Sequence, residues 1–336
     1  MTGKRFFILL FIVIVAGVSC RRIEQKENSP NDSLTIEKLT AKIRENPKNA
    51  KYFFQRSKLY FSKKQTEDAI KDIEIAIKLD SMQPEFYTTV AEYYLSTGKS
   101  GSSKNYLEKC IRLFPDSAEA FIKLADIYLY VKDYQKSMEY LLKAQEKNRN
   151  IAEIYFTKAM IYKEMDDTTR AIDNLLTSVE KNPDYYEGYI ELGHMYLLRN
   201  DSLAVGFLKN AIRILPHSSE AYYFIGIYYQ QNGQFQKAID YFNSIVSRVD
   251  NTYPYAYYNI GYINLVYYKN YNAAIEYFTK AIENKTNYYQ AYYNSGYAYE
   301  LSGQFDMASA NYRQSLDLLP NYELAVSGLN RLDKKR

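Results

Sequence analysis

The chain has 336 residues and a formal net charge of +4, from 43 basic and 39 acidic side chains. This near balance provides no strongly basic field for phosphate groups, so we expect no nucleic-acid partner. Only 13 glycines and 8 prolines occur, and 47% of the residues are hydrophobic. Such a composition argues against a disordered chain or a β-rich fold and favours a long helical protein.

The first 20 residues have the pattern of a targeting segment. Lys4 and Arg5 precede an apolar run over residues 6–18, which is too short to span a bilayer comfortably as a helix. Small residues then lead into Cys20. Residues 21–32 are polar and cannot bury enough apolar surface to fold by themselves.

This arrangement resembles a bacterial lipoprotein signal, although Gly17 stands where such signals usually have Leu. The resemblance implies a signal peptide over residues 1–19, lipidation of Cys20 and a flexible tether over residues 20–33. Arg21, rather than Asp, after the cysteine implies export to the outer membrane, with the folded part facing the periplasm. A plain secretory signal and an uncleaved anchor helix remain open alternatives.

Residues 34–47 are predicted to form a short N-terminal capping helix. Ile36, Leu39 and Ile43 share one face of such a helix, and Pro47 ends it. We therefore expect the repeats described next to begin behind a helical cap.

From residue 50 onward the sequence repeats itself every 33 to 35 residues. One small residue in each copy, called the marker from here on, sets the register: Ser57, Ala91, Ala125, Ala159, Gly193, Gly226, Gly261 and Gly296. An aromatic residue stands four positions before every marker. A tyrosine stands three positions after it, with Asn264 as the exception. Small residues let two antiparallel helices approach closely, and the large residues fill the space beside the crossing.

This pattern resembles the tetratricopeptide repeat, and eight consecutive copies cover residues 50–321. The resemblance implies an all-α fold, a right-handed superhelix or α-solenoid whose concave groove is lined by the first helix of each repeat. Residues 322–336 are expected to form a C-terminal capping helix. The spacing changes by one residue near Asn200 and near Lys269, which we place in the turns between helices.

Few residues are available for catalysis or metal binding. The only histidines, His194 and His217, lie on separate elements, and no zinc or nucleophile motif occurs. We therefore predict that the chain is not an enzyme and holds no cofactor or metal. His194 is interpreted as a side chain at the groove rim, and Cys110 as a small core residue in a slot that other repeats fill with Ala.

The C-terminal repeats contain the candidate binding residues. First helices there present side chains that contacts within a helix pair do not explain, and tyrosine is a common residue of binding surfaces. In some peptide-binding members of the family, asparagines at the slot of Asn259 and Asn294 grip a peptide backbone, for which an amide is suited. Abundance of Tyr and Asn in this chain is the alternative explanation. The predicted groove consists of Tyr223, Ile227, Tyr258, Asn259, Tyr262, Tyr293, Asn294 and Tyr297.

A glutamate recurs at one slot in five successive repeats. We interpret it as the first turn of a helix, where a carboxylate complements the exposed N–H groups. An acidic ladder for a basic peptide is the alternative. The five residues are Glu85, Glu119, Glu153, Glu187 and Glu220.

These features together predict a non-catalytic, membrane-tethered scaffold that binds an extended peptide or a partner protein in its groove, in envelope assembly or biogenesis. The alternative is a module that contacts carbohydrate or peptidoglycan through its tyrosine-rich groove. Tyrosine faces are suited to both tasks.

Overall fold

The computed structural model describes residues 34–334. The predicted signal peptide, Cys20 and the tether lie outside the described residues, so cleavage and lipidation stay predictions. The described part contains eighteen α-helices, two short π-helical turns and no strand. The predicted all-α solenoid of helix–turn–helix repeats is therefore confirmed. None of the helices in this part is long and apolar enough to cross a bilayer.

The chain divides into two compact units, between Ser81 and Met82. In its described part, the first unit contains the capping helix α1 (Ile36–Glu45) and the first helix pair, α2 (Ala50–Ser62) and α3 (Thr66–Leu79). Arg56 ties the cap to the pair, because it donates to Thr40 Oγ1 at 2.9 Å and to both carboxylate oxygens of Asp72 at 2.6 and 2.8 Å. Such a bidentate pair fixes geometry as well as charge.

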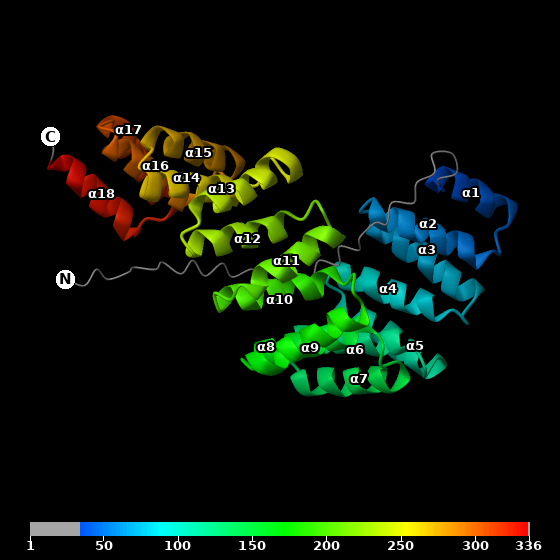
Figure 1. Ribbon diagram of the computed structural model, residues 1–336. Coiled ribbons are helices and arrows are strands. Elements are labelled where there is room, and N and C mark those ends of the chain that lie inside the picture. Colours follow the sequence, from blue (N-terminus) through cyan, green and yellow to red (C-terminus); the bar gives the residue numbers. More distant parts are fainter. Residues whose placement is uncertain (1–33, 335–336) are drawn as a thin grey trace. The chain divides into compact units, whose positions relative to one another are not determined.

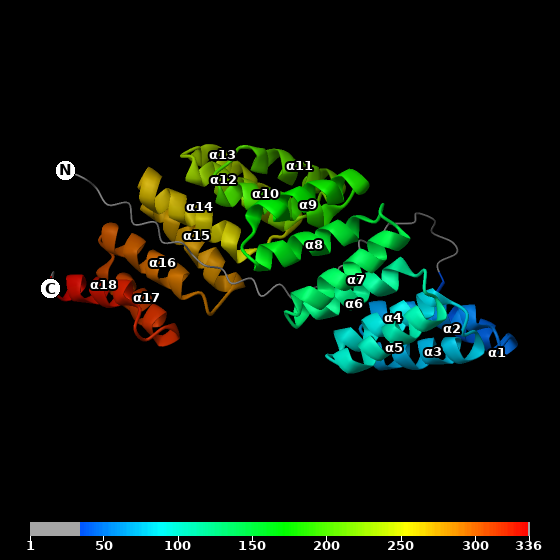
Figure 2. The same ribbon diagram turned by 90° about the horizontal axis from the view of Figure 1, so that it is seen from below.

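The second compact unit contains seven further helix pairs and a final single helix. Each helix contacts its pair partner, and successive pairs contact one another in chain order (Figures 1 and 2). The helices are α4 (Pro84–Ser96), α5 (Ser100–Leu113), α6 (Ala118–Tyr130), α7 (Tyr134–Lys147), α8 (Ala152–Glu164), α9 (Thr168–Lys181), α10 (Tyr186–Leu198), α11 (Leu203–Ile214), α12 (Ser219–Gln231), α13 (Phe235–Ser244), α14 (Pro254–Ile263), α15 (Tyr271–Asn284), α16 (Tyr289–Leu301), α17 (Phe305–Leu318) and α18 (Glu323–Asp333).

The marker residues lie at the closest approach of the two helices in a pair. A Cβ atom added to Gly193 would stand 2.4 Å from Leu208 Cγ, and one added to Gly226 would stand 2.5 Å from a ring carbon of Phe242. Both distances are far below van der Waals contact, so a larger residue there would force Leu208 or Phe242 to move. Cys110 occupies the core as predicted, fully buried beside the backbone of Pro84.

The turn between the two helices of a repeat contains a residue in the left-handed region. In the second compact unit this is Gly98, Gly233 or Gly303 in three repeats, whereas the other four use Lys132, Asp166, Asn200 and Lys269 at φ between 53° and 60°. Residues other than glycine are disfavoured there. These turns therefore contain local strain that glycine would relieve.

Two extra residues are accommodated inside helices rather than in turns. Helix α13 ends in the π-helical turn η1 (Ile245–Val249), and α14 ends in η2 (Asn264–Tyr268). Both fall where the marker spacing is 35 instead of 34. The placement of the second extra residue in a turn near Lys269 is thus wrong in detail: the insertion widens the last turn of α14, and Lys269 is the left-handed residue that follows.

Candidate functional site

The predicted groove residues occupy three slots on the first helices α12, α14 and α16. The slot three residues before the marker is filled by Tyr223, Tyr258 and Tyr293. Each ring lies against the core aromatic residue of the second helix in its own repeat, at centroid distances of 5.8, 5.7 and 5.8 Å. These tyrosines therefore contribute to packing, and burial raises the pKa of Tyr223 to about 12.

A second tyrosine from the next repeat covers each of these rings. It is the residue immediately before the next first helix, and the centroid distances are 5.7, 5.0 and 5.4 Å for the pairs Tyr223–Tyr253, Tyr258–Tyr288 and Tyr293–Tyr322. Phe156 and Tyr185 form the same contact two repeats before Tyr223, at 5.4 Å. Offset and edge-to-face aromatic pairs of this kind stabilise an interface beyond their buried area.

The two asparagines complete the contact between repeats. Asn259 Nδ2 donates to the Tyr223 hydroxyl at 3.2 Å, and Asn294 Nδ2 donates to the Tyr258 hydroxyl at 2.8 Å. Only 7% and 8% of the two asparagines remain exposed. The prediction that packing does not explain Asn259 and Asn294 is wrong. It took account of contacts within a helix pair but not of contacts between successive repeats. Peptide binding by the amides stays a prediction.

The slot one residue after the marker keeps accessible surface. It is filled by Ile227, Tyr262 and Tyr297, all of which are half-buried. Tyr262 stacks on Tyr258 at 6.4 Å, and Tyr297 stacks on Tyr293 at 6.3 Å. Tyr258 and Tyr293 thus support Tyr262 and Tyr297 and limit their movement.

A buried polar network holds the last helix against the eighth repeat. Arg331 of α18 donates to both carboxylate oxygens of Glu300, at 3.1 and 2.8 Å, and Tyr312 donates its hydroxyl to the same carboxylate at 2.8 Å. Glu300 is 5% exposed. The sequence analysis missed this network. The available signal was a glutamate in a slot that holds Leu95, Leu129, Leu197 and Leu265 in other repeats.

Polar side chains link the first helices of the middle repeats. Lys123 forms an ion pair with Glu92 at 3.4 Å, and Lys163 forms one with Glu191 at 2.6 Å. Thr157 donates its hydroxyl to the half-buried carboxylate of Asp126 at 3.0 Å. Burial raises the pKa of Asp126 to about 6.

The recurring glutamates lie where we predicted, in the first turns of α4, α6, α8, α10 and α12. This confirms the placement on which the structural interpretation depends. Burial and a nearby carboxylate raise the pKa of Glu187 and of Glu220.

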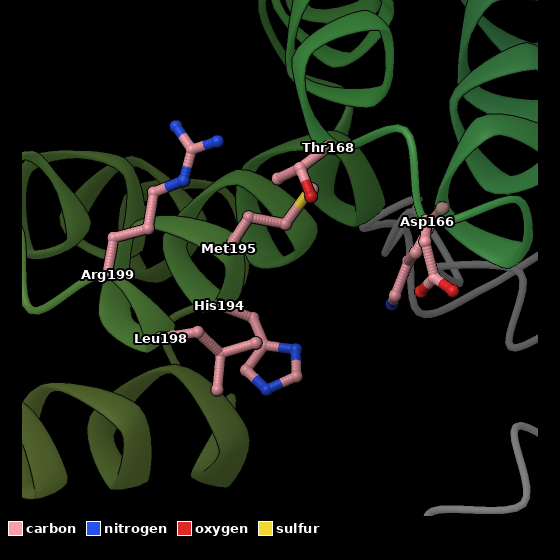
Figure 3. Close-up of a pocket in the computed structure, with 7 residues that line it drawn as sticks. Asp166, Thr168, His194, Met195, Leu198 and Arg199 are labelled. Atoms are coloured by element: carbon pink, nitrogen blue, oxygen red, sulfur yellow. The ribbon is translucent and has the colours of Figure 1, made fainter.

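A pocket of about 260 Å³ lies at the turn end of α8 and α10. Its lining consists of Lys163, Asp166, Thr168, His194, Met195, Leu198 and Arg199. In Figure 3 the His194 ring lies beside Leu198, and Asp166 comes from the opposite side. His194 also stacks on Phe224 at 5.0 Å, and burial lowers its pKa. The imidazole is thus held by a ring contact, and Lys163 in the same lining is engaged by Glu191.

The comparisons with known proteins agree with this architecture. A family model described as the tetratricopeptide repeat protein 21 ARM repeat matches residues 42–203. The tetratricopeptide repeat model itself matches residues 219–248, 254–288 and 289–322. The chain contains tetratricopeptide repeats. Neither model describes an enzyme, and a search of curated proteins found no match.

Solved structures of tetratricopeptide-repeat (TPR) proteins share the fold at low identity. The C-terminal part of a TPR-containing protein from Cytophaga hutchinsonii is 17% identical, with a TM-score of 0.59 over 72% of this chain and 99% of that one. Pseudomonas aeruginosa pilF is 16% identical, with a TM-score of 0.54 over 64% and 97%. The Cut9–Hcn1 complex of the APC/C contains a chain that is 17% identical, with a TM-score of 0.54 over 88% of this chain. This chain spans 58% of that protein's length.

Proposed function

We propose that this TPR chain is a non-catalytic scaffold that binds an extended peptide or a partner protein along its first helices. The observation that carries the proposal is the row of Ile227, Tyr262 and Tyr297. These side chains occupy one slot in three successive first helices and remain partly exposed, while Asn259 and Asn294 beside them are buried between repeats. TPR arrays generally serve protein–protein interaction.

The support beneath this row favours binding. Tyr258 and Tyr293 are held by aromatic contacts on both sides, and Tyr258 is also held by Asn294. The half-buried rings of Tyr262 and Tyr297, which stack on them, therefore lose little freedom when a partner binds. Rigid aromatic side chains bind at a low cost in conformational entropy.

A pull-down compares the wild type with the variant Ile227→Ala/Tyr262→Ala/Tyr297→Ala. The matched control is Leu142→Ala/Leu176→Ala, which removes two exposed side chains from the second helices α7 and α9. We expect the triple variant to lose a protein that both the wild type and the control retain. A protein that is lost equally from both variants, or from neither, contradicts the proposal.

We further propose that the scaffold is attached to the outer membrane through lipidated Cys20, faces the periplasm, and serves envelope assembly or biogenesis. The lipoprotein-like pattern that ends at Cys20 supports this part. Two lipid chains, each with many buried CH2 groups, give stable anchoring. The substitution Cys20→Ala should move the protein from the membrane to the soluble fraction. Persistent attachment of that variant would favour an anchor helix.

A further inference from the structure

The turns of the sixth and seventh repeats together expose an aromatic surface that repeat packing does not require. The π-helical turn η2 places Val266, Tyr267 and Tyr268 at the surface. Their exposed fractions are 41%, 45% and 47%, respectively. Contiguous exposed surface of large side chains often marks an interaction site. π-helical turns are rare and often mark functional sites.

The exposed tyrosines are organised by Phe235, the first residue of α13 in the preceding repeat. Tyr267 stacks on Phe235 with ring centroids 3.8 Å apart and planes 23° from parallel. Tyr268 meets the same ring edge-on at 6.4 Å and 89°. Phe235, Tyr267 and Tyr268, called the turn platform from here on, thus form one surface built from two repeats.

The polar groups around the turn platform are mostly uncharged. Residues 230–235 and 264–270 contain no carboxylate, and the cations at these turns are Lys269 and Lys237, whose Nζ donates to Gln234 Oε1 at 2.8 Å. Gln231, Gln234 and Asn270 are exposed in the same two turns. A basic peptide would find no acidic partner here. A nucleic acid would find too few cations for its phosphates.

We propose that the turn platform binds an uncharged glycan. A sugar ring has a flat C–H face, which stacks on an aromatic ring, and a rim of hydroxyls. Amide and phenol groups can both donate to and accept from those hydroxyls. The combination of tyrosine faces, amides and no carboxylate matches that chemistry. This proposal is independent of partner binding along the first helices.

The test uses the full-length chain in a non-glycosidic detergent and three probes: chitohexaose, cellohexaose and maltohexaose. Saturation-transfer NMR and calorimetric titration measure binding. We expect at least one probe to bind the wild type, and Tyr267→Ala/Tyr268→Ala to weaken that binding by about tenfold or more, which corresponds to about 1.4 kcal/mol. Tyr267→Phe/Tyr268→Phe keeps the rings and should retain most of the affinity.

The matched control is Tyr130→Ala/Val131→Ala in the equivalent turn of the third repeat, where the two residues are 73% and 56% exposed. It should bind like the wild type. Three results overturn the proposal: no probe binds the wild type; binding survives in Tyr267→Ala/Tyr268→Ala with an unchanged circular dichroism spectrum; or the control loses binding equally. Tyrosine-dependent binding to phosphatidylcholine vesicles in place of the sugars would also overturn it.

Discussion

The side-chain amide of Asn294 donates a hydrogen bond to the hydroxyl of Tyr258 at 2.8 Å, across the interface between the seventh and eighth repeats. Asn259 makes the same bond to Tyr223 one repeat earlier, at 3.2 Å. Each bond joins residues 36 positions apart. The aromatic contacts between repeats and these bonds together fix the spacing of the three first helices that present Ile227, Tyr262 and Tyr297.

We predict that Asn294→Ala lowers the free energy of unfolding by about 1–3 kcal/mol, because the Tyr258 hydroxyl is then buried without a partner. Tyr258→Phe alone should cost less, about 1 kcal/mol. The loss in the free energy of unfolding for the double variant should therefore be smaller than the sum of the losses for the two single variants. Urea denaturation of all four proteins measures the coupling. Tyr130→Phe, which changes an exposed ring, is the control, and strict additivity would contradict the prediction.

The raised pKa of Asp126 gives stability a defined pH dependence. The folded-state pKa is about 6 and the ordinary value is 3.8, so the folded protein binds the proton more tightly than the unfolded chain. The free energy of unfolding must then fall as the pH rises from about 4 to 6. Asp126→Asn keeps an acceptor for Thr157 and removes the titration. We expect it to be about 1–2 kcal/mol more stable than the wild type at pH 7, and equally stable near pH 4. Thermal denaturation at both pH values checks this prediction. A stability difference between Asp126→Asn and the wild type that is equal at pH 4 and pH 7 would contradict it.

Lys158 is a buried amine in a slot that other repeats fill with apolar residues such as Leu124 and Leu192. Its Nζ donates to Gln145, and burial lowers its pKa. We predict that Lys158→Leu raises the free energy of unfolding by about 1–2 kcal/mol near neutral pH. The gain should shrink as the pH rises toward the ordinary lysine value, since the wild type then loses its buried charge. Lys143→Leu on exposed surface should have little effect, and a destabilised Lys158→Leu would argue that the slot requires the amine.

The strained turns predict a stabilising substitution. Lys132 has φ of 60°, and its ion pair with Glu164 is exposed and therefore weak. Lys132→Gly should raise the free energy of unfolding by about 0.5–1 kcal/mol, since glycine adopts this region without steric cost. Lys209→Gly, inside α11, should lower it by about 1 kcal/mol. Equal effects of the two substitutions in chemical denaturation would refute the role of the turn.

The helix pairs could be predicted from the sequence because their contacts recur at a fixed register. Each marker faces the second helix of its own repeat, as Gly226 faces Phe242. Contacts between repeats were harder to predict, because they join slots that are filled differently along the chain. The Tyr–Asn contact, as between Tyr258 and Asn294, is made only in the last repeats. Glu300 pairs with Arg331, which lies in a helix outside the repeat pattern. The candidate residues were thus located correctly on the first helices, but their division into buried and accessible members required the structure.

The central claim, that a protein partner lies along the first helices, is tested most directly by site-specific photo-crosslinking in living cells of the native host. p-Benzoylphenylalanine is placed at Ile227, Tyr262 or Tyr297, and at Leu142 or Leu176 as controls on second helices. The account predicts one shared protein adduct from the first three positions and none from the two controls. Adducts only from the controls, equal adducts from all five positions, or none at all would contradict it.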